Sequence, residues 1–323
     1  MRLLILLFLL PAVSVAQVPH TFNNGEVADA EKMNENFDSL AGNISALELR
    51  IAPEHLISEA VDCSADPAAL NKSLSQNSGV HRLELNVSGE CLLDESTQAL
   101  QLRYRSLFIN GDTASTTTLS SPSEIRFQAR TSAVLSLTNI TLSAPQIRFY
   151  IANHSSGVMT DVSLAAPEDG LPFITHVIAA NQSVVLISGS AGKTMSWKRV
   201  TAQTNSRISF LANIDPAVQP EFYVADQSSV TLRGQGVVGV LNCENLSYCL
   251  AFNYPNVTGS SAPLITEQLS ITYGSVFRTF SNPSCDLAPE YVAATYSNRT
   301  IHSGGQHYIQ DRCNPDEPPQ TVQ

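Results

Sequence analysis

Short runs in which apolar and polar residues alternate recur through the middle of the chain. Each run follows a polar phrase in which an alanine stands four residues before a serine, as in Ala179–Ser183 and Ala202–Ser206. The serines of the clearest copies stand at positions 156, 183, 206 and 229, so they are 27, 23 and 23 residues apart. A second alternating segment precedes most copies, for example residues 148–151 and 222–224. The pattern predicts two short strands per repeat with a polar turn between them.

A unit of this size cannot bury its apolar side alone, so successive units must stack and share one core. We therefore expect an all-β fold: a right-handed parallel β-helix over residues 54–260, with a short N-terminal α-helix and an irregular C-terminal cap. A β-sandwich is the main alternative, because its strands also recur about every 8 to 12 residues. A sandwich does not explain a repeat of residue identity. The repeat fades over residues 261–323, which we assign to the cap and a disordered tail.

Residues 1–16 have the three zones of a secretory signal peptide. Arg2 supplies a positive charge, residues 3–10 are apolar, and Ser14 and Ala16 are the small residues that a signal peptidase reads. The apolar run is too short for a membrane span, which needs about 20 residues. We expect cleavage after Ala16 and a secreted protein that is periplasmic, extracellular or at the cell surface, with no membrane span.

The segment 17–53 contains a heptad pattern. Its apolar residues are separated by alternating steps of four and three, and they stand at positions 33, 37, 40, 44, 47 and 51 before Pro53 ends the run. This predicts an amphipathic helix. Residues 33–51 either join copies into a homo-oligomer or pack on the body of their own chain, and both alternatives stay open.

Six cysteines lie in the expected mature chain. An even number in an exported protein predicts disulfides. No two cysteines have the C-x-x-C spacing of metal sites, and the histidines are scattered, so we expect no metal and no cofactor. Proximity along the chain favours the pairs Cys63–Cys91, Cys243–Cys249 and Cys285–Cys313.

The formal net charge of −11, with charged residues making up 15% of the chain, argues against nucleic acid as a partner. Binding to nucleic acid requires clustered lysine and arginine. Serine, threonine and asparagine are abundant, which predicts a neutral surface rich in hydroxyl groups.

Three segments resemble known families. Residues 20–37, with the pattern T-F-x-x-G…A-D-A-x-x-x-N-x-N-F, resemble the N-terminal segments of bacterial secreted proteins and of phage tail-fibre or tail-spike-like proteins. Residues 61–71 resemble the beginning of the pectate-lyase-like β-helix superfamily, where a short helix precedes the first coil, and residues 135–142 resemble one of its coils. The resemblance implies a bacterial exported protein with a β-helical body. It lies in the coil pattern and carries over no functional residue.

Candidate catalytic residues are few. Glycoside hydrolysis uses two carboxylates, and Asp112 and Asp161 would lie about 10 Å apart if their coils are two apart and aligned. A polysaccharide lyase would need a basic residue, for which Lys198, Arg207 and Arg233 are candidates. For each of the five, a solvated turn or strand position is the favoured interpretation.

Asparagines at the turns, Asn153, Asn181 and Asn205, are expected to stack into an internal ladder that satisfies backbone groups. No column of catalytic residues emerges from the repeat, whereas stacked coils present a long regular face to an extended polymer. We therefore predict a non-catalytic glycan-binding, adhesion or structural module whose partner is an extended polysaccharide. The alternative is a polysaccharide lyase or glycoside hydrolase on the same scaffold.

Overall fold

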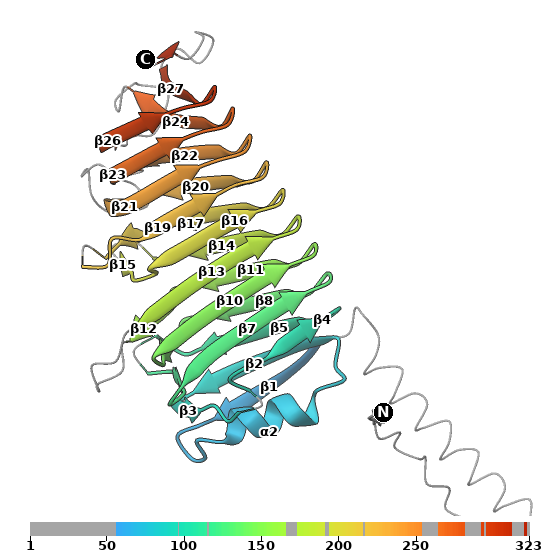
Figure 1. Cartoon of the computed structure of the whole chain (residues 1–323). Coiled ribbons are helices and arrows are strands. Elements are labelled where there is room, and N and C mark those ends of the chain that lie inside the picture. The colour runs from blue at the N-terminus through green and yellow to red at the C-terminus, as the bar shows by residue number, and fades with distance from the viewer. Residues whose placement is uncertain are drawn as a thin grey trace, which may run out of the picture. The chain divides into compact units, whose positions relative to one another are not determined.

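The computed structural model describes residues 56–95, 97–114, 116–165, 173–190, 194–215, 217–253, 264–281, 292–293, 295–311 and 320–321. The predicted signal peptide and the heptad segment lie outside these ranges, as do Cys285 and Cys313. Over the described residues from Leu56 onward, strands stack in successive coils from β1 to β27 (Figure 1). No helix in this part of the chain is long and apolar enough to cross a membrane.

The described strands fall into a long sheet, a broad sheet and a short sheet, and the short sheet contains strands from only four coils. The long sheet follows the order β1 (Leu56–Asp62), β2 (Arg82–Ser88), β5 (Ser106–Gly111), β8 (Val134–Thr138), β11 (Ser156–Thr160), β14 (Val184–Ser188), β17 (Arg207–Leu211), β20 (Ser229–Arg233), β22 (Tyr248–Asn253), β24 (Val276–Ser281), β27 (Gln306–Asp311) and β28 (Gln320–Thr321), with β25 (Val292–Ala293) beside β22.

The broad sheet lies beside it and follows the order β26 (Thr295–Ile301), β23 (Leu264–Ile271), β21 (Gly236–Cys243), β19 (Glu221–Val224), β16 (Arg199–Gln203), β13 (Ile174–Ala180), β10 (Gln146–Ala152), β7 (Glu124–Arg130) and β4 (Gln101–Arg103). The short sheet contains β12 (Ser163–Ala165), β9 (Thr141–Ser143), β6 (Thr118–Ser120) and β3 (Glu90–Leu92). A separate pair joins β15 (Thr194–Met195) to β18 (Asn213–Ile214).

Neighbouring coils pair in parallel throughout the described stack, and antiparallel pairing there is confined to β25 and β28. A β-sandwich would pair its strands antiparallel, so the parallel β-helix is confirmed. The short helix α2 (Ala69–Gln76) follows β1 and packs its buried Leu70 and Leu74 under the first coils.

The alternating pattern places every second strand residue inside. In β7, for example, Ile125, Phe127 and Ala129 are buried while their neighbours face outward. Aromatic rings from successive coils meet edge to face, with the Phe149 ring centroid 5.5 Å from both Phe127 and Trp197. The core is therefore one continuous column shared by all coils.

Parallel pairing also continues where the repeat fades from the sequence. Beyond residue 260, β23 pairs with β21 and β26, and β24 pairs with β22 and β27. The stack thus runs further than the boundary at 260 that we expected, and described residues of the segment 261–323 form further coils.

Two of the three expected disulfides are confirmed. Cys63 and Cys91 are bonded with a Cα–Cα distance of 5.1 Å, and Cys243 and Cys249 with one of 6.3 Å. All four side chains are buried. The first bond ties the opening coils together, and the second spans the tight turn between β21 and β22.

Candidate functional site

Asp161, one of the two candidate carboxylates, has a structural task. It lies in the turn after β11, is 8% exposed, and has a positive φ of 53°. Its carboxylate accepts hydrogen bonds from the Ser190 N–H (2.6 Å) and the Ser190 hydroxyl, and its own N–H donates to the Ser188 carbonyl. The side chain therefore connects the turns of two neighbouring coils.

Asp112 does not share a position with it. Asn110 and Thr160 belong to one column of the long sheet, because both align with Thr138. Asp112 stands two residues after Asn110, whereas Asp161 stands one residue after Thr160. Asp112 is also exposed. The two carboxylates occupy different positions of their coils.

The three basic candidates are also separated. Arg207 is the first residue of β17 and Arg233 the last of β20, both exposed on the long sheet. Lys198 directly precedes β16 of the broad sheet, with its ammonium 6.0 Å from the Phe173 ring centroid. The structure does not gather the five predicted residues at one site.

The most regular surface of the molecule is the turn edge, where each broad-sheet strand passes into a long-sheet strand through two residues. In Figure 1 these turns form a column of tight loops along the right-hand side. In the turns after β7 and the later strands both central residues have positive φ, as in Asn153 (57°) and His154 (64°), or Thr204 (56°) and Asn205 (58°). In the turns from β7 to β23 the second of these residues donates its N–H to the carbonyl of the first residue in the next coil, as Asn205 does to Asp226 at 2.9 Å.

A row of buried serines supports the turn edge from inside. The Ser183 N–H donates to the Ser206 hydroxyl (3.2 Å), and the Ser206 N–H donates to the Ser228 hydroxyl (3.0 Å). The row contains Ser155, Ser183, Ser206, Ser228, Ser247 and Ser275, each at most 2% exposed. These hydroxyls satisfy the buried backbone donors of the turns.

The turn asparagines do not form the internal ladder that we predicted. The Asn181 amide does donate to the Asn153 amide oxygen (2.9 Å), but this bond lies at the surface. Asn205 is exposed as well. The internal ladder consists of serines, and the asparagines decorate the outside of the same turns.

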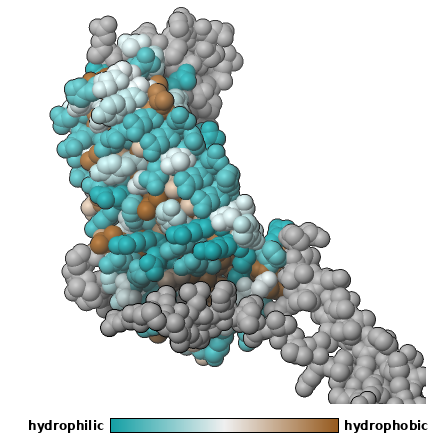
Figure 2. Space-filling model, turned by 45° about the vertical axis from the view of Figure 1, so that its right-hand side comes forward, coloured by the Kyte–Doolittle hydropathy of each residue, from teal (hydrophilic) through white to brown (hydrophobic). Residues whose placement is uncertain are grey.

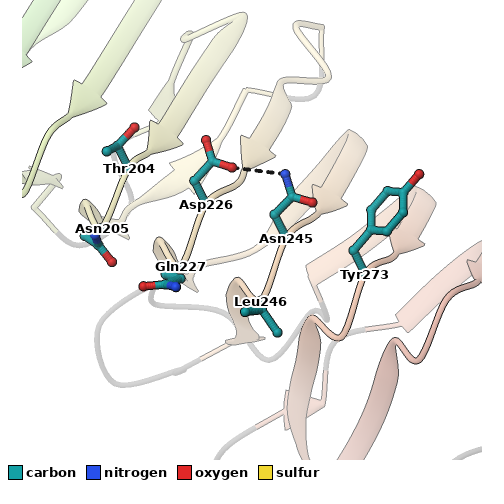
Figure 3. Close-up of a pocket in the computed structure, with 7 residues that line it drawn as sticks. All are labelled: Thr204, Asn205, Asp226, Gln227, Asn245, Leu246 and Tyr273. Carbon is teal, nitrogen blue, oxygen red and sulfur yellow. Dashed lines mark hydrogen bonds between the residues drawn. The ribbon is translucent and has the colours of Figure 1, made fainter.

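A groove of about 480 Å³ crosses the turn edge near the C-terminal end of the stack. Figure 3 shows that its side chains come from four successive turns and form two rows. One row contains Thr204, Asp226, Asn245 and Tyr273, and the other Asn205, Gln227 and Leu246. The Asn245 amide donates to the Asp226 carboxylate (3.0 Å), which orients both groups. Leu246 and Tyr273 are 63% and 59% exposed. Groups for hydrogen bonding thus stand beside an open aromatic ring.

A second cleft, of about 430 Å³, lies on the broad sheet between Phe173, His176, Lys198 and Glu221. Burial, followed by the positive charges of Arg199 and Arg148, lowers the pKa of His176 to about 4. His176 Nε2 lies 3.0 Å from Thr201 Oγ1. The imidazole is therefore neutral near pH 7, and its environment is cationic.

The sequence predicted neither the groove at the turn edge nor the cleft on the broad sheet. The turn residues were recognised as turns, but Tyr273 lies beyond residue 260, where the repeat was no longer visible. Among the described residues, no group of three or more His, Cys, Asp and Glu side chains is arranged to hold a metal ion.

Comparison with known proteins adds no relative. No family model, no curated protein and no solved structure matches this chain. The link to phage tail proteins or to a particular β-helix family is accordingly a resemblance in sequence pattern alone.

Proposed function

We propose that this chain is an exported, non-catalytic glycan-binding protein that holds a neutral stretch of polysaccharide in the groove at the turn edge. The observation that carries the proposal is the exposed Tyr273 ring beside the Asp226–Asn245 pair. Aromatic rings pack against the apolar C–H face of a sugar ring, while a few placed polar groups bond its hydroxyls and give orientation.

The geometry also suits a polymer. Successive turns repeat about every 4.8 Å along the stack, and each adds one polar or aromatic side chain to the row. A ligand that itself repeats can therefore contact several coils at once.

The separation of the candidate catalytic residues favours binding over catalysis. Asp161 is bonded to Ser190, Asp112 lies at a different coil position, and Lys198 is on another sheet from Arg207. None of these residues lines the turn-edge groove.

The proposal is tested with the mature chain and soluble β-1,4-glucan, β-1,3-glucan, xylan and mannan, using affinity electrophoresis and then titration calorimetry. We expect binding to at least one of these glycans and a loss of tenfold or more in Tyr273→Ala. Tyr104→Ala is the matched control, because Tyr104 is 63% exposed, has a φ of 54° against 52° for Tyr273, and lies on the same edge outside the groove.

Three results would overturn the proposal. The first is the absence of binding to all four glycans, and the second is an equal loss in both tyrosine variants. The third is the appearance of new reducing ends or of unsaturated products on incubation, which would establish the enzymatic alternative.

A further inference from the structure

Cationic side chains gather on the outward face of the broad sheet. They belong to strands β4, β7 and β10 and to the start of β16, and they are Arg103, Arg126, Arg130, Arg148, Lys198 and Arg199. The parallel register aligns them. Arg126 pairs with Arg148, Arg148 with His176, and His176 with Arg199, while Arg103 pairs with Arg130 in a neighbouring column. We call this surface the basic face.

The basic face keeps a positive excess after its ion pairs are counted. Strands β4, β7, β10, β13, β16 and β19 carry two carboxylates, Glu124 at 3.5 Å from Arg126 and Glu221 at 2.8 Å from Arg199. The same strands carry five arginines, so three positive charges are left over, and Lys198 beside β16 adds a fourth, in a chain whose net charge is −11. The charge of the whole chain therefore conceals a local surface of opposite sign.

Aromatic rings hold several of these cations in place. The Arg130 guanidinium lies 4.9 Å from the Tyr150 ring centroid, and the Arg199 guanidinium lies 5.3 Å from that of Tyr223. A guanidinium that rests on a ring loses little freedom when an anion arrives at its N–H edge. The two tyrosine rings therefore orient the guanidinium groups and are not free to stack against a ligand.

Between these columns the surface is neutral and polar. Gln128 lies between Arg126 and Arg130 on β7, and Thr201 lies on β16 beside the cleft at His176. Figure 2, in which the right-hand side of Figure 1 comes forward, shows a largely hydrophilic surface where hydrophobic residues appear as separate spots. Such a surface suits a hydrated ligand rather than an apolar partner.

We infer that the basic face binds a linear polysaccharide that carries closely spaced sulfate or carboxylate groups. Arg126 and Arg148 stand one coil apart, about 4.8 Å, and Arg148 and Arg199 two coils apart, about 10 Å, so the column offers cations at spacings that match anions along a polymer. The planar guanidinium also favours two-point contacts to carboxylate and sulfate. This surface is separate from the turn-edge groove, so the inference does not depend on binding of neutral sugar there.

Nucleic acid fits this face less well. Proteins that bind single strands offer open aromatic rings for base stacking, whereas Tyr150 and Tyr223 already lie under guanidinium groups.

The experiment measures binding of the mature chain to heparin, alginate, neutral dextran and a DNA duplex, at 50 and at 300 mM NaCl. We expect binding to heparin or alginate but not to dextran, and a marked weakening at the higher salt because exposed charges are screened. The heparin and alginate arms distinguish sulfate from carboxylate recognition.

The variant Arg148→Glu reverses one exposed charge at the centre of the aligned column and should weaken binding tenfold or more. Arg207→Glu is the matched control, since it makes the same charge change at an exposed strand position on the long sheet. Unchanged thermal unfolding of both variants shows that they remain folded.

Failure to bind either acidic polymer, an equal loss in Arg207→Glu, or tighter binding to DNA than to both polymers would each overturn the inference. Tyr273→Ala separates it from the proposed function, because this change should weaken neutral-glycan binding and leave acidic-polymer binding intact. Arg148→Glu should have the reverse effect.

Discussion

The turn edge and the basic face are built by the same coils but solve different physical problems. At the turn edge the backbone is held in the left-handed region, and its buried donors are satisfied by serine hydroxyls. On the basic face the backbone is an ordinary parallel sheet, and the outward side chains are free to vary. The turn edge is constrained from inside and carries mostly uncharged side chains, with Asp226 as an exception, whereas the basic face is not constrained in this way and is positively charged.

This difference indicates where function can reside in a stacked fold. Inward positions must maintain the core and the turns, so their residue types recur in the sequence. Outward positions on the broad sheet do not contribute to the core or to the turns. The arginines that align there on successive strands are therefore not explained by core packing. The following predictions probe that contrast, beginning with the largest expected effect.

Removal of the second disulfide should affect the turn edge most. Cys243→Ala with Cys249→Ala deletes the bond across the turn at Asn245 and Leu246 and should lower the free energy of unfolding by about 2 to 4 kcal/mol. Denaturant unfolding measures the loss. Neutral-glycan affinity should fall as well, while acidic-polymer affinity stays the same.

The other disulfide provides the control for this experiment. Cys63→Ala with Cys91→Ala also removes one bond and lowers stability, but it lies in the opening coils. If both double variants reduced neutral-glycan binding equally, the link between the Cys243–Cys249 bond and the groove would be refuted.

The buried serine row should be costly to interrupt. Ser206→Val leaves the Ser183 N–H without its acceptor inside the core, which should cost about 1 to 3 kcal/mol of stability. Ser209→Val, on the same strand but facing outward, should change stability by less than about 0.5 kcal/mol. Similar unfolding midpoints for the two variants would show that the row does not support the turns.

Two threonines should respond to glycine with opposite signs. Thr204 has a φ of 56° in its turn, so Thr204→Gly relieves a left-handed conformation and should raise stability by about 0.5 kcal/mol. Thr201 lies in β16, where glycine loses conformational freedom and the contact to His176, so Thr201→Gly should lower stability by about 1 kcal/mol. Thermal unfolding of both variants tests the contrast, which fails if the signs agree.

The smallest effect concerns pH and the basic face. Burial, Arg199 and Arg148 hold the pKa of His176 at about 4, and a bound anion favours the protonated imidazole and raises it. Acidic-polymer affinity should therefore increase as pH falls from 6 to 4, by about twofold if the pKa in the complex rises by half a unit. Lys198 and Glu221 also line this cleft, so the pH titration is repeated in His176→Asn, where the added slope should disappear.

Much of the fold was predictable because inward residues follow strict rules. Alternation placed the strands, and the phrase ending in serine marked the turn. The exact register was not predictable where serines are doubled. Ser156 and Ser229 were aligned with Ser183 and Ser206, but the inward partners are Ser155 and Ser228, since Ser156 pairs with Val184 and Ser229 with Arg207. Where two serines are adjacent, the sequence does not show which of them is the repeat position. An alignment that is wrong by one residue exchanges the inward and outward faces of the strand.

The surfaces were less predictable than the core. Asp161 resembled a catalytic carboxylate in sequence, because nothing there reveals its bonds to Ser190 one coil away. The basic face was hidden for a different reason: Arg126, Arg148 and Arg199 are far apart in the chain, and their alignment depends on coil lengths of 22, 28 and 23 residues, as the paired positions 134, 156, 184 and 207 show.

The two-residue turn also governs how such a molecule can change in size. Ser229 and its partner Tyr248 are 19 residues apart, whereas Val276 and its partner Gln306 are 30 apart, yet both coils pass the edge through the same two-residue bend. The additional residues of the longer coil therefore lie outside this turn, and the spacing between successive turns along the edge stays constant. Loops elsewhere around the coil can become longer without changing the distance between successive turns that a long ligand contacts along the turn edge.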